Sequence, residues 1–219
     1  MARLIEYLQS ERATPALLAV VVVGLFVISP LADMGYLHSR LPEYVFWLFL
    51  VLGVFIITHH PILRWTNLVL AVGAVLTSIT KGGHHSMLES VFTVLYVLLL
   101  TLVYWQRVFS PGRVNFYRIV GAVTIYLFIG VLWAEFYKIL ELGMPGSFRF
   151  GPDFQGARLE NNMIYFSFIT LTTVGYGDAT PCQPLSHSLA VLEALVGQVY
   201  LTVLIGRLVA SLQSPALAE

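Results

Sequence analysis

Residues 170–178 carry the pattern with the clearest chemistry in this sequence: Thr-Leu-Thr-Thr-Val-Gly-Tyr-Gly-Asp. Backbone carbonyls of successive residues can face one axis only if the chain alternates between right-handed and left-handed conformations. Gly175 and Gly177 permit the left-handed steps without steric cost. A row of uncharged carbonyl oxygens can replace the water around a cation. The carboxylate of Asp178 follows directly, where it can raise the local concentration of cations.

The composition places this segment in a membrane protein. Hydrophobic residues make up 58% of the 219 residues and charged residues only 11%, whereas soluble domains average about 25% charged residues. Twelve Lys and Arg balance twelve Asp and Glu, so no basic excess favours nucleic acid. The single cysteine, Cys182, excludes an intrachain disulfide, and no Cys/His cluster has zinc-ligand spacing. We expect no cofactor.

Six apolar stretches predict membrane spans, because a bilayer core about 30 Å thick needs roughly 17–25 helical residues. They are residues 15–29, 43–58, 62–80, 87–105, 118–140 and 186–212. The first is short and is expected to stop at Pro30 and Asp33. We interpret it as a permanent span and not a signal peptide, because no small-residue cleavage site follows. Residues 1–12 suit either a short interfacial helix or a frayed tail.

About forty-five residues separate the fifth and sixth stretches, which is too many for a turn. Their second half, residues 161–172, is apolar and aromatic but too short to cross, which predicts a half-helix entering the membrane inside a protein wall. The partial negative charge at its C-terminal end favours a cation there. The expected fold is therefore an all-α membrane protein: six transmembrane helices, with a re-entrant pore helix and filter between helices five and six.

The centre of the motif resembles the selectivity filter of potassium channels: Thr173, Val174, Gly175, Tyr176 and Gly177. The resemblance to tetrameric pore-loop channels covers residues 118–212, as outer helix, pore helix, filter and inner helix. It implies that K⁺ binds to the carbonyl oxygens of residues 173–176 and to the Thr173 hydroxyl. It also implies that the side chains of Val174 and Tyr176 point into the surrounding wall, and that Asp178 stands at the outer mouth. One pore loop per chain implies a homotetramer.

The resemblance assigns supporting roles to further residues. Tyr165 and Phe166 on the pore helix are placed to pack around the filter, although they also suit a plain core. Glu193 in the sixth span is expected to support the filter by a hydrogen bond to the pore helix or to stay protonated. Gly197 matches the family's glycine hinge, and it equally suits close helix packing. The expected pore-facing residues lie on one helical face: Gln198, Leu201, Ile205 and Val209.

Two departures from the family bear on gating. Many members carry a carboxylate four residues before the filter threonine, where this chain has Ile169, so we expect filter inactivation to differ. Residues 88–105 of the fourth span contain no Lys or Arg, so steep voltage dependence is not expected. We divide the chain into a four-helix domain, residues 1–112, and a pore domain, residues 113–219. The distribution of Arg and Lys favours a cell-membrane protein with both termini cytoplasmic.

The remaining candidate residues are assigned less specific roles. The pairs His59-His60 and His84-His85 lie about 36 Å apart along the third span, so they cannot share a metal ion within one subunit. We interpret them as interfacial histidines. Cys182 is either exposed at the outer mouth or packed behind the loop.

The expected function is passive K⁺ conduction by a homotetramer in the lipid bilayer. The sequence does not decide whether a cytosolic regulator also binds. The alternative is a non-conducting or regulatory subunit of a cation channel or potassium-uptake complex. Uptake transporters of the pore-loop type carry four pore loops in one chain, and this chain has one. No catalytic arrangement of side chains supports an enzyme.

Overall fold

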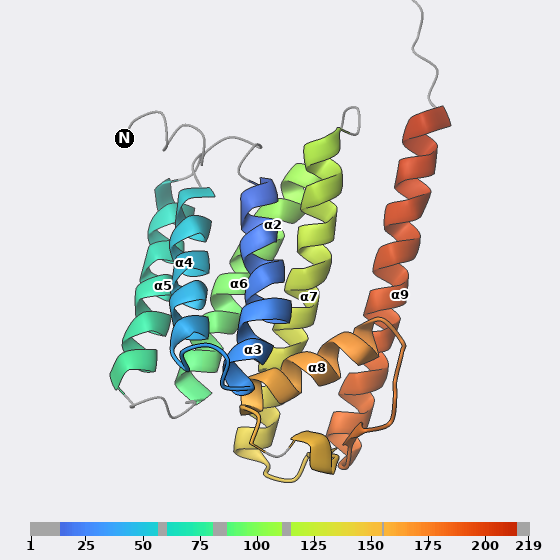
Figure 1. The fold of residues 1–219 in the computed structure, drawn as a ribbon. Helices are drawn as coiled ribbons and strands as arrows, with labels where there is room; N and C mark the ends of the chain where they lie inside the picture. Colours follow the sequence, from blue (N-terminus) through green and yellow to red (C-terminus); the bar gives the residue numbers. More distant parts are fainter. Residues whose placement is uncertain (1–13, 57–60, 81–86, 111–114, 155, 214–219) are drawn as a thin grey trace, which may run out of the picture.

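The computed structural model describes residues 14–56, 61–80, 87–110, 115–154 and 156–213. Most of them are helical (Figure 1). The elements before the candidate site are α2 (Thr14–Val23), the π-helical turn η2 (Gly24–Ile28), α3 (Ser29–Asp33), α4 (Leu41–Ile56), α5 (Pro61–Thr80), α6 (Met87–Val108) and α7 (Phe116–Gly143). Those around it are β1 (Phe148–Phe150), η3 (Pro152–Phe154), α8 (Leu159–Leu171), β2 (Ala179–Pro181) and α9 (Pro184–Gln213).

Five helices of the described chain are long and apolar enough to cross a membrane: Thr14–Asp33, Ile62–Ile79, Met87–Val108, Phe116–Gly143 and Pro184–Ala210. The apolar part of α4, Leu41–Phe55, is shorter. This arrangement fits an all-α membrane protein, and five of the six predicted spans meet the length of a bilayer. The N-terminal tail and both histidine pairs lie outside the described residues.

The first helix does not stop at Pro30, contrary to the sequence prediction. A π-helical turn precedes the proline, and the backbone N–H of Ser29 donates to the carbonyl of Gly24, five residues earlier. Pro30 then lies in the first turn of α3, where its missing N–H leaves no helical hydrogen bond unmade. The helix therefore continues to Asp33 and gains the length that the predicted stretch lacked.

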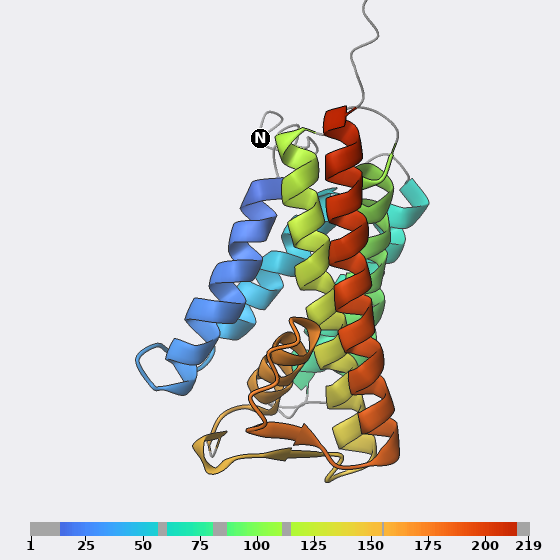
Figure 2. The ribbon, with the colours of Figure 1, turned by 90° about the vertical axis from the view of Figure 1, so that its right-hand side faces the viewer.

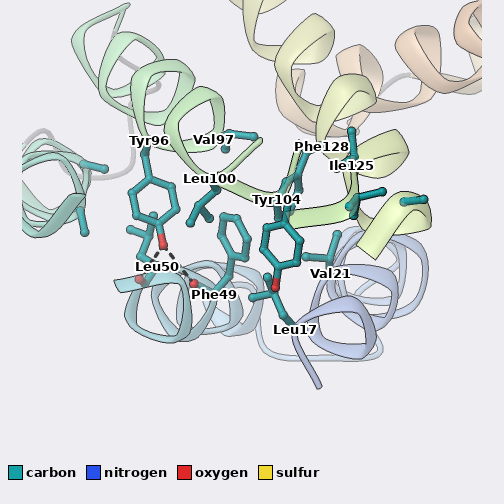
Figure 3. Packing of buried hydrophobic residues seen from close by; sticks show 14 of the residues in the cluster. Leu17, Val21, Phe49, Leu50, Tyr96, Val97, Leu100, Tyr104, Ile125 and Phe128 are labelled. Carbon is teal, nitrogen blue, oxygen red and sulfur yellow. Dashed lines mark hydrogen bonds between the residues drawn. The ribbon is translucent and has the colours of Figure 1, made fainter. Parts of the chain in front are cut away.

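The N-terminal helices pack on α6 and α7 through one apolar cluster (Figure 3). Tyr96 of α6 is fully buried; its hydroxyl donates to the backbone carbonyl of Leu50 at 2.6 Å and lies 3.3 Å from that of Phe49. Gly53 makes this approach possible, because a Cβ atom there would lie 2.0 Å from the Tyr96 hydroxyl oxygen. The edge-on ring contacts of Phe49 with Tyr96 and Phe128 join α4 to α6 and α7.

The all-α prediction missed a short β-ribbon. Strands β1 and β2 pair antiparallel, with Phe148 opposite Pro181 and Phe150 opposite Ala179. The ribbon lies at the end of the molecule opposite to the start of α2 and the end of α9 (Figures 1 and 2). Three-residue strands are too short to produce a readable alternation of apolar and polar residues. The pairing fastens the segment before α8 to the segment that follows residues 173–178.

We expect Gly53→Ala to lower the free energy of unfolding by about 2 kcal/mol, because the added methyl group overlaps the Tyr96 hydroxyl. Denaturant unfolding of the purified protein in detergent micelles measures the change. The double variant Gly53→Ala/Tyr96→Phe is the control, since removal of the hydroxyl relieves most of the overlap and should restore part of the loss. Equal losses in the single and double variants would show that α4 and α6 do not meet at this point.

Candidate functional site

The backbone of residues 173–177 alternates in handedness. Thr173, Gly175 and Gly177 have positive φ angles of 59°, 53° and 83°, whereas Val174 and Tyr176 between them do not. The two glycines have the conformation that the sequence predicted. Thr173 was not expected to adopt it, because β-branched residues rarely do, and it is the one described non-glycine residue with positive φ. This alternation is what allows successive carbonyls to face the same axis.

The segment begins directly on the C-terminal end of α8. The N–H groups of Val174 and Gly175 both donate to the carbonyl of Ile169, at 2.8 and 3.2 Å. Tyr126 of α7 donates its hydroxyl to the carbonyl of Leu171 at 3.2 Å. The last carbonyls of a helix carry partial negative charge. The entry to residues 173–177 is therefore fixed next to a site that is favourable for a cation.

The far end of the segment is held by Asp178. Its backbone carbonyl accepts from the N–H of Gly151 at 2.8 Å, beside the ribbon. Its carboxylate accepts a hydrogen bond of 2.6 Å from the hydroxyl of Tyr165 on α8. The hydroxyl is the donor in this contact, since a carboxylate can only accept. Phe166, the other predicted aromatic neighbour, is buried against Tyr137 and Phe148, behind α8.

Glu193 connects its own helix, α9, to both α7 and α8. Its side chain is fully buried, and Oε2 accepts a 2.5 Å hydrogen bond from the hydroxyl of Tyr137 on α7. Oε1 lies 2.5 Å from the hydroxyl of Ser167 on α8, which also lies 2.7 Å from the carbonyl oxygen of Gly130. The single proton of that hydroxyl can serve only one of these two acceptors. A protonated Glu193 that donates to Ser167, while Ser167 donates to Gly130, satisfies every group.

The inner face of α9 approaches the same region. A Cβ atom at Gly197 would lie 2.3 Å from the carbonyl oxygen of Leu171, so a glycine is required where α9 passes the end of α8. The close contact between the two helices is enough to explain why residue 197 is a glycine. Its role as a hinge stays a prediction. Gln198 is exposed, and its Nε2 lies 3.4 Å from the hydroxyl oxygen of Thr173. Ile205 and Val209 are exposed as well, whereas Leu201 is half-buried against the apolar cluster of α6 and α7.

Sequence reasoning missed a polar cluster that anchors the N-terminal end of α8 to the first helix. The Nε atom of Arg158 donates to Oδ1 of Asp33 at 2.7 Å, and Asn161 donates to the other carboxylate oxygen. The hydroxyl of Ser29 donates to Oδ1 of Asn161 at 2.6 Å. These partners lie more than 120 residues apart, so no local pattern in the sequence indicates the contact.

Several residues around the site are exposed in the single chain. The exposed fractions of Val174 and Tyr176 are 49% and 73%, although both were expected to point into a wall. Cys182 is also exposed, and its backbone N–H donates to the carbonyl of Ser147 at 2.8 Å. The structure thus brings Tyr165 and Gln198 to the 173–178 segment, whereas Phe166 and Leu201 pack in apolar clusters. The exposed side chains leave one side of the segment uncovered.

Comparison with known proteins points to the same region. Residues 156–214, which include α8, the 173–177 segment and α9, match the family model described as "Ion channel". The chain is 34% identical over 83 residues to the inward rectifier potassium channel Kirbac3.1 of Paramagnetospirillum magnetotacticum, a match covering 36% of this chain and 24% of that protein. It is 29% identical over 97 residues to a voltage-gated potassium channel of Aeropyrum pernix, covering 44% and 29%.

The chain therefore spans less than a third of the length of either relative. No solved structure gives a significant match. The matches support the predicted relation to ion channels, with potassium channels among the relatives, and they point to a channel and not to an enzyme.

We expect Glu193→Ala to lower the free energy of unfolding by about 3 kcal/mol, because it leaves the buried hydroxyls of Tyr137 and Ser167 without this partner. Glu193→Gln should cost less than about 1 kcal/mol, since the amide also presents a donor on one side and an acceptor oxygen on the other, and only its second N–H is left over. Denaturant unfolding measures both changes, and infrared spectroscopy should detect the protonated carboxyl band only in the natural protein. Equal losses for the two variants would contradict the protonated form.

Proposed function

We propose that this chain is a subunit of a potassium-selective channel that conducts K⁺ passively across the cell membrane. The observation that carries the proposal is the alternating backbone of residues 173–177, on a sequence shared with potassium-channel filters. In this proposal K⁺ binds the carbonyl oxygens of Thr173, Val174, Gly175 and Tyr176 and the Thr173 hydroxyl. Asp178 concentrates cations at the outer mouth, and no cofactor other than the permeant ion takes part.

The uncovered side of the site supports a homotetramer. One filter segment cannot surround an ion, so copies of the chain must supply the other sides. The exposed side chains of Val174 and Tyr176 are large and apolar, and so are several on α9, such as Leu195 and Val199. Apolar surface of this kind marks an interaction site. In the proposed tetramer neighbouring subunits cover these side chains, and Gln198, Ile205 and Val209 line the cavity below the filter.

The membrane topology follows from the arrangement of the helices. The start of α2 and the end of α9 lie at one end of the molecule, which we assign to the cytoplasmic side, and the ribbon lies at the opposite end (Figure 1). In this topology α8 is the re-entrant pore helix, and α4 is the second of six spans. The described part of α4 has 16 residues and is about 24 Å long.

The proposal does not include a voltage sensor of charged residues. Helix α6 contains one basic residue, Arg107, in its last turn, and the membrane field acts steeply only on several mobile charges. The polar cluster of Arg158 and Asp33 instead connects the first helix to α8. We infer that the N-terminal helices hold the pore helix in place.

Recording from the purified protein in planar bilayers tests the proposal. The reversal potential should follow the K⁺ gradient and not the Na⁺ gradient, and Ba²⁺ should block, because it has nearly the radius of K⁺ but twice the charge.

Gly175→Ala should abolish selective current, since alanine is strained at a φ of 53°. Gly146→Ala is the matched control, because Gly146 also has positive φ but lies between α7 and β1. Equal permeation of Na⁺ and K⁺ would contradict the assignment of residues 173–177 as a K⁺-selective filter. Absence of current would favour the alternative of a non-conducting subunit.

Cys182 tests the position of the outer mouth, because its side chain is exposed beyond β2. A cationic methanethiosulfonate reagent applied from outside should modify the thiol and lower the inward K⁺ current by repelling the ion. An anionic reagent of similar size should lower it less. Cys182→Ser is the control and should be insensitive to both reagents. Absence of an adduct by mass spectrometry, with unchanged current, would place Cys182 away from the mouth.

A further inference from the structure

A buried ion cluster lies beside the first turn of α8, at the end of that helix away from the candidate filter. Its centre is Lys138 of α7, whose side chain is only 3% exposed. The Nζ atom of Lys138 lies 3.2 Å from Oε1 of Glu160 in α8 and 3.5 Å from Oε2 of Glu135 in α7. Glu89 at the start of α6 also interacts electrostatically with this ammonium group. The cluster therefore connects α7 to the start of α8.

The contact of Lys138 with Glu160 differs from its contact with Glu135. Glu135 lies one turn before Lys138 on α7, so this pair forms within one helix. Glu160 is the acidic residue in the first turn of α8, where a negative charge also suits the partial positive charge of the helix end. The pair of Lys138 with Glu160 is therefore the one that fixes one helix against the other.

Loss of Lys138 would leave negative charges facing one another. The carboxylates of Glu135 and Glu160 both approach its ammonium group, and their side chains are only 16% and 25% exposed. Two other basic residues line the adjoining cavity: Arg158 is already bound in the polar cluster with the first helix, and Arg40 is exposed before α4. Without the ammonium group the two carboxylates repel, which favours a larger separation of α7 and the start of α8.

Helix α8 leads from this ion cluster to the candidate filter. Its first turn is held by Lys138, and its middle is held by the hydrogen bond of Ser167 with Glu193. In its last turn, the carbonyl of Ile169 accepts from the N–H groups of two filter residues. The candidate filter thus begins on a helix whose other end depends on a buried ion pair.

We propose that Lys138 is a positioning residue of the filter. Through Glu160 it fixes the start of α8, and the last turn of α8 in turn fixes the backbone of residues 173–175. The inference rests on the proposed function, because it concerns the ion-binding segment of that channel. Loss of the pair should loosen the hydrogen bonds at the filter entry and leave the N-terminal helices folded.

Hydrogen exchange of the purified full chain, followed by mass spectrometry, tests this role without any current. In Lys138→Met, a peptide that covers residues 170–177 should exchange about tenfold faster than in the natural protein, whereas peptides from α4, α5 and α6 should exchange normally. Arg149→Met is the matched control, because Arg149 is an exposed basic residue of β1 outside the cluster, and it should leave the exchange unchanged. Lys138→Arg keeps the positive charge and should exchange like the natural protein.

A double-mutant cycle separates the pair from a general effect of a buried charge. Glu160→Gln should also speed the exchange of residues 170–177, and the double variant Lys138→Met/Glu160→Gln should exchange no faster than Lys138→Met, because the two residues act as one pair. Glu160 is partly exposed, so Glu160→Gln keeps the test decisive if Lys138→Met does not fold. Unchanged exchange of residues 170–177, or equally faster exchange in every helix, would overturn the proposal.

Reversal potentials separate this inference from the proposed function. Lys138→Met should lower the K⁺-to-Na⁺ permeability ratio about tenfold, whereas poorer folding alone would lower only the number of channels. An unchanged ratio in Lys138→Met would overturn the positioning role and leave the proposed conduction intact. A natural protein without K⁺ current would contradict the proposed function, and hydrogen exchange would still decide whether Lys138 positions residues 173–175.

Discussion

The buried carboxyl group of Glu193 is the interaction on which the arrangement around α8 depends. It contacts Tyr137 of α7 and Ser167 of α8 from its own helix, α9, so one side chain fixes the mutual positions of three helices. Helix α8, which it helps to hold, leads into a backbone that is itself costly, because a threonine with positive φ costs about 1–2 kcal/mol. Such a conformation persists only where the surrounding structure imposes it. The backbone hydrogen bonds from Thr173, Val174 and Gly175 to the last turn of α8 supply that constraint.

The same principle explains why the candidate filter is fastened at both ends. At its entry, two N–H groups converge on the carbonyl of Ile169, which places the first carbonyls of the segment against the end of α8. At its exit, Tyr165 binds the carboxylate of Asp178, and the backbone of Asp178 accepts from Gly151 beside the ribbon. Both ends of the segment are therefore hydrogen-bonded to α8, and its exit is also bonded to the residue that follows β1.

Much of this arrangement could be predicted from the sequence, because hydrophobic length and a short motif are local signals. The predicted half-helix 161–172 agrees closely with α8, and Gly175 and Gly177 have the expected conformation. The π-helical turn before Pro30 was missed because proline ordinarily ends a helix, and only the structure shows the widened turn that accommodates it. The contact of Arg158 with Asp33 was missed because tertiary hydrogen bonds leave no periodicity in the sequence. A hinge at Gly197 rests on the resemblance alone, because bending of α9 is a motion and leaves no pattern in the sequence.

The contact between Arg158 and Asp33 gives the N-terminal helices a physical relation to the filter. Helix α8 has 13 residues, so it is about 20 Å long and rigid over that distance. Its N-terminal end is bound to the end of the first helix, and its C-terminal end carries the first residues of the filter. One 13-residue helix therefore links the end of the first helix to residues 173–175. In the proposed channel, the N-terminal helices thus help to position the helix on which the candidate filter begins.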